Sequence, residues 1–369
     1  MKNTKQNKAY KFRIYPNEEQ KIIFAKTFGC TRFIYNKMLS DKIDYYQQTK
    51  QRLNNTPAQY KTEFEWLKEV DSLALANAQI NLQKAFTNFF NNPKSGFPKF
   101  KSKHKNRKSY TTNNQRNTIA LKNGYLKLPK LVDLVRVKQH RQISKDHKIK
   151  SVTISQTPSG KYYASILCEY ESQIQPIESQ TFLGLDFSMK ELYVASDNTS
   201  AEYPRYFRKS QKKLAREQRK LSKCVIGSQK RNKQRLKVAK LHEKVANQRK
   251  DFLHRLSRQI ANTYDCVCIE DLDMKAMSQA LNFGKSVADN GWGMFTTFLK
   301  YKLEDLGKQL IKIDRWFPSS KTCSNCGNVK ENLSLSDRIY HCNYCGITIN
   351  RDYNASMNIK NQGMKLVIS

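Results

Sequence analysis

The sequence predicts an α+β multidomain protein in which a small antiparallel β-barrel is interrupted by a helical bundle and followed by an α/β domain. Short alternating segments with hairpin turns lie on both sides of a long stretch with helical periodicity. Apolar runs that end on acidic residues come next, and two pairs of closely spaced cysteines stand near the C-terminus. With 369 residues the chain has room for two or three such domains.

The composition indicates a polyanionic partner. The chain has 67 basic and 31 acidic residues, a formal net charge of +36, and its 19 Tyr and 18 Phe exclude a disordered basic tail. It has no apolar run of the roughly 18 residues that predict a membrane span, and its polar N-terminus lacks the apolar core of a signal peptide. Because the nine cysteines are an odd number and no secretion signal is present, we expect reduced thiols in a cytoplasm.

The first predicted element is a strand, and a helix follows it. Residues 10–14 alternate apolar and basic side chains, which is typical of a strand with one buried and one cationic face. Pro16 ends this strand. Asn17 and Gln20 have the spacing of a capping box, so we expect a helix to begin there.

Helical patterns continue to residue 92. Gly29 predicts a break in the first helix, and further helical patterns cover residues 32–46 and 72–90. Residues 17–92 are therefore predicted to form a helical bundle inserted after a single strand.

Two hairpins supply strand partners for residues 10–14. Asn123-Gly124 lies between two short apolar segments in residues 119–128 and is a strong hairpin signal. Residues 150–155 and 162–169 are separated by a second turn. We expect these strands and the first one to form the barrel.

The segment between the bundle and the hairpins is basic and carries aromatic residues. Phe97 and Phe100 alternate with cations, a pattern suited to contact with a nucleic-acid backbone, with rings able to stack on bases. The alternative is a solvated basic loop. The candidate nucleic-acid contacts here are Lys99, Lys101, Lys103 and Lys105.

Acids follow or begin buried elements at three places in the chain. Asp186 ends the apolar run 182–186, Glu270 and Asp271 end the run 266–271, and Asp352 stands where a helix is expected to begin. A carboxylate at the end of a central strand is costly to bury unless positive charge meets it. One such acid would more often bind turn amides, but three together suit a site for divalent cations in phosphodiester chemistry.

Residues 205–258 are the most basic part of the chain. Apolar residues recur there at helical spacing, and residues 225–228 form a turn, so we expect two long helices back to back. A solvated coiled coil would mix acids and bases on its outer face, whereas acids are scarce here. The candidate nucleic-acid contacts on this hairpin are Arg208, Lys209, Lys212, Lys213, Arg216, Arg219 and Lys220.

Two Cys-x-x-Cys pairs predict a structural zinc ribbon. Fifteen residues separate the pairs, and a glycine follows each pair where a knuckle turns. Four ordinary core thiols would be out of place in so polar a segment. The predicted zinc ligands are Cys323, Cys326, Cys342 and Cys345.

These motifs, in this order, resemble the OrfB/TnpB proteins of bacterial insertion sequences. The resemblance rests on Gly184-Leu185-Asp186, Ile269-Glu270-Asp271, the paired cysteines and the run Arg351–Ala355. It also covers the N-terminal segment, the basic segment with its two phenylalanines and the residues that lead into the first cysteine pair. Such proteins are RNA-guided DNA nucleases related to type V CRISPR effectors.

The resemblance implies a domain arrangement. Residues 179–317 and 347–369 would form an RNase H-like (RuvC) nuclease domain, with Asp186 on its first strand, Glu270 on its fourth and Asp352 on its final helix. Residues 318–346 would be the inserted zinc ribbon. The barrel, residues 1–16 and 93–178, would be the wedge domain, and the bundle would be the recognition domain.

The resemblance also implies a mechanism and partners. Two Mg²⁺ ions about 4 Å apart would activate a water and stabilise the leaving 3′-oxygen, bridged by Asp186 and held singly by Glu270 and Asp352. A guide RNA would select double-stranded target DNA by base pairing, and the protein would read a short flanking motif. The expected location is a bacterial cytoplasm, on the nucleoid when DNA is bound.

Two departures and two alternatives accompany this hypothesis. Family members often have glycine at Ser188 and an acid at Asn350, and the latter change could alter the geometry around Asp352. The chain could instead be an RNA-guided repressor that binds DNA without cutting. It could also be an RNase H-type transposase that uses a similar triad for strand transfer. Because all three acids are present, we interpret the chain as a nuclease.

Overall fold

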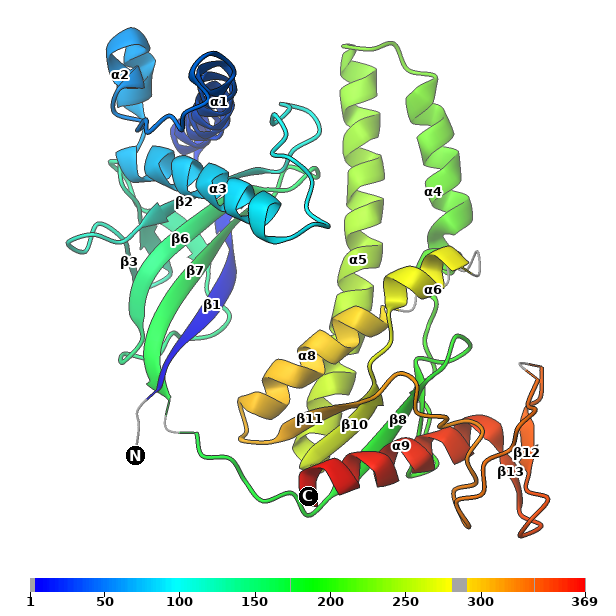
Figure 1. Ribbon diagram of the computed structural model, residues 1–369. Coiled ribbons are helices and arrows are strands. Elements are labelled where there is room, and N and C mark those ends of the chain that lie inside the picture. Colours follow the sequence, from blue (N-terminus) through cyan, green and yellow to red (C-terminus); the bar gives the residue numbers. More distant parts are fainter. Residues whose placement is uncertain (1–3, 173, 281–290, 335, 369) are drawn as a thin grey trace. The chain divides into compact units, whose positions relative to one another are not determined.

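The computed structural model describes residues 4–172, 174–280, 291–334 and 336–368. The chain forms two compact units, Met1–Gln173 and Ile174–Ser369 (Figure 1). No helix within the described ranges is long and apolar enough to cross a membrane.

The N-terminal unit contains a seven-stranded antiparallel sheet in the order β2-β6-β7-β1-β5-β4-β3. The predicted first strand and both hairpins are confirmed. Within residues 4–172 no ladder joins β2 to β3 at the two ends of the sheet, so the closed barrel is not confirmed. The strands are β1 (Thr4–Tyr15), β2 (Lys108–Asn113), β3 (Ala120–Lys122), β4 (Tyr125–Lys127), β5 (Val135–Lys138), β6 (Lys148–Gln156) and β7 (Tyr162–Ser172).

The helices of this unit follow β1, as predicted. Asn17 caps the first helix, and its side chain and that of Gln20 form both hydrogen bonds of the capping box. The buried face of the sheet packs against residues such as Phe24 and Phe28, and a second core lies among the helices themselves. The helical elements are α1 (Glu18–Thr49), α2 (Tyr60–Glu63), a 3₁₀ turn (Glu65–Glu69) and α3 (Ser72–Asn91).

The predicted break at Gly29 is wrong, because α1 is continuous over 32 residues. Glycine costs a helix about 1 kcal/mol relative to alanine. That cost is outweighed here by burial on both sides, since Phe24, Ile34 and Met38 are fully buried on the same helix.

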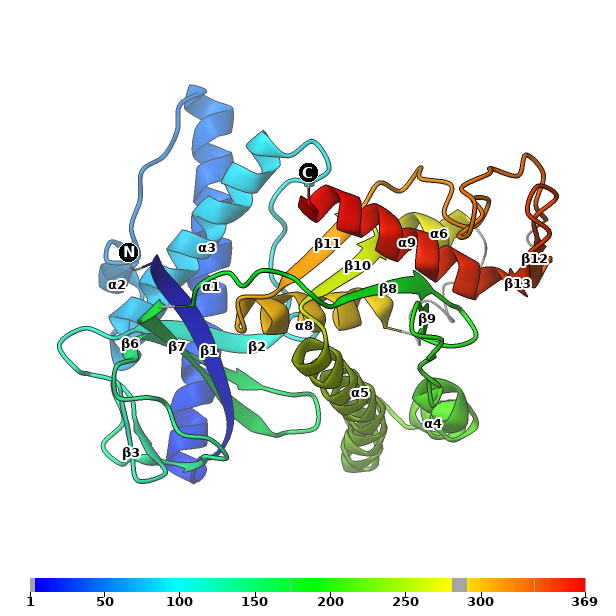
Figure 2. The ribbon, with the colours of Figure 1, turned by 90° about the horizontal axis from the view of Figure 1, so that it is seen from below.

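The C-terminal unit is built on a sheet of order β11-β10-β8-β9. Its strands are β8 (Phe182–Phe187), β9 (Tyr193–Ala195), β10 (Cys266–Glu270) and β11 (Gln309–Ile313). β8, β10 and β11 run parallel, and β9 is antiparallel to β8. Helix α9 (Arg351–Ile368) lies along one face of this sheet (Figures 1 and 2).

The two faces of this sheet have separate cores. Leu183, Leu185 and Ile269 pack with α5 (Gln229–Thr263) and α8 (Trp292–Glu304). On the other face Cys266 and Cys268 pack against α9. Because successive residues of a strand point to opposite faces, even-numbered residues of β8 and β10 face α9.

The resemblance implied that Glu270 lies on the fourth strand of the domain, but in the structure it lies on the third, β10. Between β9 and β10 the chain makes an isolated bridge from Val194 to Ser200. This bridge is a single residue pair and not a strand, so β10 is the third strand of this sheet along the chain.

A helical hairpin and a small ribbon complete the unit. Helix α4 (Tyr206–Ser222) packs along α5, which confirms the predicted pair of basic helices (Figure 1). A short helix, α6 (Met274–Ala280), follows β10. The first cysteine pair precedes a two-stranded ribbon of β12 (Ile339–His341) and β13 (Thr348–Asn350), and the second pair lies in the turn between these strands.

Candidate functional site

Asp186 and Glu270 lie beside each other at the carboxyl ends of two parallel strands. β8 and β10 pair in register up to Leu185 and Ile269. Asp186 and Glu270 are the next residues, so their backbones are about 4.8 Å apart and their side chains share the face that α9 covers.

Two glycines let α9 lie directly on this face. A Cβ atom at Gly184 would stand 2.1 Å from the carbonyl oxygen of Ser356, and one at Gly363 would stand 2.1 Å from Sγ of Cys268. No larger residue fits either contact. Asp352 is one helical turn before Ser356, and Asp186 is two residues beyond Gly184, so the helix begins over the ends of the strands.

The start of α9 is fixed by Asn350. Its Oδ1 atom accepts hydrogen bonds of 3.0 Å from the backbone N–H groups of Asp352 and Tyr353, which is an N-cap. Asparagine and aspartate cap helices about equally well, so this departure from the family pattern keeps the helix start in place. At the other departure, Ser188 Oγ accepts a hydrogen bond of 3.3 Å from the backbone N–H of Glu191.

The charges of Glu270 and Asp352 both act on Asp186. Among the described residues, however, the four cysteines of the predicted zinc ribbon are the group whose ligand atoms already lie close enough together for one metal ion, and the three acids do not form such a group. Burial raises the pKa of Asp186 well above its usual range, and the charges of Glu270 and Asp352 raise it further. The Arg351 guanidinium acts in the opposite direction on this pKa. Burial also raises the pKa of Glu270. Carboxylates held together in this way are destabilised by their negative charge, and their oxygen atoms are the ligands that hard divalent cations prefer.

Glu270, rather than the adjacent Asp271, belongs to this cluster. Asp271 pairs with Lys312 Nζ at 2.7 Å and with Arg315 at 3.1 Å. These two cations lower the pKa of Asp271. The negative charge of Asp271 is therefore already compensated by these two cations.

Three polar side chains around Glu270 were missed by the sequence analysis. Ser319 Oγ donates a hydrogen bond to Glu270 Oε1. Asn358 on α9 donates to the carbonyl oxygens of Ser319 and Thr322 at 2.8 and 2.6 Å, and Asn354 donates to Thr322 O at 2.7 Å. One helix therefore carries Asp352 and also holds the loop that contacts Glu270. The i, i+4 spacing of the two asparagines was the available signal.

The structure brings the four predicted zinc ligands together. Their Sγ atoms all lie within 4.8 Å of one another, and two of the pairs are 3.6 Å apart. Tetrahedral Zn–S bonds of about 2.3 Å place sulfur atoms about 3.8 Å apart, so this geometry fits one metal ion. The four members are Cys323, Cys326, Cys342 and Cys345.

Hydrogen bonds act in opposite directions on these thiols. The backbone N–H of Ile347 is the largest cause that lowers the pKa of Cys345 to about 6, and a backbone hydrogen bond from Cys345 lowers the pKa of Cys342. At Cys326 a backbone hydrogen bond from Asn328 lowers the pKa, but burial and contacts with the other thiols outweigh it and raise the pKa to about 12.

Gly327 and Gly346 adopt φ of 76° and 75°, which the two knuckle turns need and other residues rarely adopt. His341 is outside the cluster and lies 2.9 Å from Thr348 Oγ1.

The basic hairpin is cationic on its outside and contains a buried acid. Glu217 lies between α4 and α5, where Lys237 Nζ approaches it at 3.1 Å and Gln234 donates to it at 2.9 Å. Arg216 and Lys220 also contact this carboxylate, at 3.5 and 3.6 Å. The candidate contacts are all exposed: Arg208, Lys209, Lys212, Lys213, Arg216, Arg219 and Lys220.

The basic segment of the N-terminal unit is only partly available to a ligand. Lys99, Lys103 and Lys105 are exposed, whereas Lys101 Nζ lies 3.8 Å from the ring centre of Tyr35 and burial lowers its pKa. Phe97 packs edge-on against Phe86 and Phe89, while Phe100 is 57% exposed.

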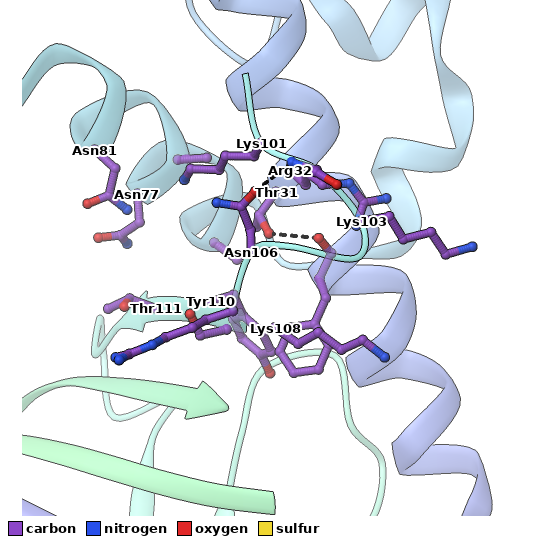
Figure 3. Close-up of a pocket in the computed structure, with 16 residues that line it drawn as sticks. Thr31, Arg32, Asn77, Asn81, Lys101, Lys103, Asn106, Lys108, Tyr110 and Thr111 are labelled. Carbon is purple, nitrogen blue, oxygen red and sulfur yellow. Dashed lines mark hydrogen bonds between the residues drawn. The ribbon is translucent and has the colours of Figure 1, made fainter. Parts of the chain in front are cut away.

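A cationic pocket of about 320 Å³ lies between α1, α3 and the segment 101–111 (Figure 3). Cations and amides line it, and no Asp or Glu is among its lining residues. Such a lining suits phosphate groups and the edges of bases. Its cations are Arg32, Lys101, Lys103, Arg107 and Lys108, and its amides are Asn77, Asn81 and Asn106.

Three family models match the chain. The model described as "Probable transposase" matches residues 165–281, and the model of a "Cas12f1-like, TNB domain" matches residues 292–359. A model described as "Helix-turn-helix domain" matches residues 1–51, where the structure has β1 and the single helix α1.

Relatives match over nearly the whole chain. A protein of Streptomyces pristinaespiralis, named as an RNA-guided DNA endonuclease, is 34% identical over 97% of this chain and 89% of its own. InsQ of Escherichia coli K12, with a similar name, is 30% identical over 96% and 92%. A Cas12f1 chain solved with sgRNA and target DNA has the same fold, with a TM-score of 0.63, 15% identity and coverage of 97% and 99%.

Proposed function

This chain belongs to the OrfB/TnpB family, and we propose that it is an RNA-guided DNA endonuclease that cleaves target DNA beside a short flanking motif. The observation that supports hydrolysis is that Asp186 and Glu270 lie at the ends of two paired strands and that the charges of Glu270 and Asp352 both raise the pKa of Asp186. The test is cleavage of matched DNA by the protein with its copurified RNA.

Carboxylate oxygens are ligands that Mg²⁺ prefers, so these three acids would hold two Mg²⁺ ions. Such ions would activate the attacking water and stabilise the leaving 3′-oxygen. Asp186, on whose pKa both other acids act, is the residue suited to contact both ions, and Glu270 and Asp352 would each hold one. The protein contributes the geometry: paired strands fix two acids, and the capped helix α9 fixes the third. The four-cysteine cluster would hold one structural Zn²⁺.

Ser319 should tune the carboxylate that it contacts. Ser319→Ala removes the donor to Glu270, and loss of this hydrogen bond raises the pKa of Glu270, because the bond favours the ionised form. We expect cleavage at neutral pH to slow about 10-fold, with the acidic limb of the pH–rate profile moved to higher pH. Ser320→Ala, one residue away, is the control. A profile that does not move would show that Ser319 has no influence on Glu270.

The basic hairpin α4–α5 and the loop 99–108 are proposed to contact guide RNA and the backbone of the RNA–DNA duplex. Replacing Lys212, Lys213 and Arg216 together with glutamine should weaken RNA binding. The slope of log Kd against log salt should fall by about 2, because fewer phosphate contacts form and fewer counterions are released on binding. Binding measured over a salt series checks this.

The control for this experiment is a triple glutamine variant of exposed lysines on the N-terminal sheet, Lys122, Lys127 and Lys138. It carries the same change of net charge. If both triple variants change the slope equally, or neither does, the assignment of the hairpin as an RNA-binding surface is wrong.

A further inference from the structure

Trp316 is the most exposed of the three tryptophans. Its side chain is 85% exposed, against 41% for Trp66 and 3% for Trp292. A tryptophan side chain is usually buried for most of its area, because its ring is large and apolar. An indole left in solvent beside a set of candidate catalytic acids points to a ligand that covers it.

The loop that carries Trp316 is attached at both ends to the strand that carries Glu270. Before the tryptophan, Arg315 pairs with Asp271 at 3.1 Å. After it, Ser319 donates a hydrogen bond to Glu270. Because Glu270 and Asp271 are consecutive at the end of β10, the indole projects from a short loop that starts and ends beside the carboxylate cluster.

The backbone of the loop is restrained at the tryptophan. The backbone N–H of Trp316 donates to Asp314 Oδ1 at 2.6 Å, which fixes a turn. Phe317 packs into the apolar cluster under α9, so the two neighbouring aromatic side chains lie in different environments. Pro318 then restricts the backbone before Ser319. An exposed ring on such a restrained loop loses little conformational entropy when it binds a ligand.

The charge around the loop favours nucleic acid as that ligand. Residues 312–321 contain Lys312, Arg315 and Lys321 and one acid, Asp314. Because Asp271 pairs with Lys312 and Arg315, a small excess of positive charge remains around the loop. Cations interleaved with an exposed aromatic ring are typical of single-strand binding, where bases stack on the ring. An apolar protein partner would instead be matched by a broader apolar surface.

We propose that Trp316 stacks on a nucleobase of the strand that is cut, and so positions an unpaired strand at Asp186, Glu270 and Asp352. The base faces of a duplex are covered by neighbouring pairs, so the indole can reach one only where the strand is single. This inference rests on the proposed nuclease function and adds a binding site and a strand conformation to it.

Kinetics give the first test. Trp316→Ala should slow cleavage of a matched target by roughly 10-fold, since stacking contributes substantially to holding a single-stranded base. Binding of the target as a whole should be unchanged, because it depends on base pairing with the guide RNA. Trp316→Tyr should recover most of the rate, because tyrosine also stacks. Trp66→Phe is the control and should cut like the wild type. Wild-type rates for Trp316→Ala, or no recovery with tyrosine, would overturn the proposal.

Fluorescence gives a test that needs no cutting. The RNA-bound Trp66→Phe protein, without added divalent cations, is titrated with single-stranded oligothymidine. We expect quenching of indole fluorescence, and loss of the quenching when Trp316→Phe is added. Stacking would be contradicted if the Trp66→Phe protein showed no quenching. It would also be contradicted if the quenching persisted in the protein with both Trp66→Phe and Trp316→Phe. Quenching by a wild-type protein that never cuts would retain this inference while the nuclease function fails.

Discussion

Asp186→Asn is expected to abolish DNA cleavage, by more than about 10³-fold, and to leave guide and target binding intact. Both other acids act on this carboxylate, which is proposed to contact both cations. Its removal would take a ligand from each cation, and such cations supply several kcal/mol to the transition state. Binding should persist because it depends on base pairing and on the basic surfaces. Cleavage and target binding are measured on the same RNA-bound preparation.

The control is Asp251→Asn, which changes an exposed acid paired with Arg255 on α5 and should cut normally. A melting measurement separates lost chemistry from misfolding. Because burial and two negative neighbours raise the pKa of Asp186, its ionised form destabilises the folded protein when no cation is bound. Asp186→Asn should therefore melt at or above the wild-type temperature without divalent cations. Residual cleavage close to the wild-type rate would mean that Asp186 is not a metal ligand.

Cys323→Ser is expected to lose the bound zinc and unfold the ribbon. A structural zinc site of this kind contributes on the order of 10 kcal/mol to folding, and it depends on all four thiolates. Cleavage should fall as well, because the ribbon is attached to α9 through hydrogen bonds from Asn354 and Asn358. Zinc content per protein chain and limited proteolysis of residues 318–346 check this.

The matched control is Cys224→Ser, a partly exposed thiol outside the cluster. Serine can keep the hydrogen bond that Cys224 Sγ makes to the Lys220 carbonyl oxygen at 3.2 Å. Its zinc content should equal that of the wild type. Wild-type protein without zinc, or full zinc in Cys323→Ser, would show that the four thiols do not form a structural metal site.

Features set by local chemistry could be predicted from the sequence. The capping box at Asn17, the turn at Asn123-Gly124 and the two-helix hairpin follow from residues close together in the chain, and the structure confirms them. The convergence of Asp186 with Glu270 was also predictable in outline, because apolar runs that end on acids predict strands that meet at one edge.

Features set by tertiary packing could not be predicted. The helix through Gly29 continues because distant side chains bury its neighbours. The hydrogen bond from Ser319 to Glu270 joins residues 49 positions apart, and no local pattern marks it. Likewise the contact of Gly184 with α9 depends on how a helix near the C-terminus crosses the sheet.

The central claim is that the chain cuts DNA selected by its RNA. The direct measurement combines the wild-type complex and its copurified RNA with a matched plasmid target, in Mg²⁺, over a library of flanking sequences. The account predicts linear or nicked plasmid for a subset of flanks, no cleavage with EDTA, and none with Asp186→Asn. Intact plasmid across the whole library, with the target bound, would contradict the nuclease and support a repressor.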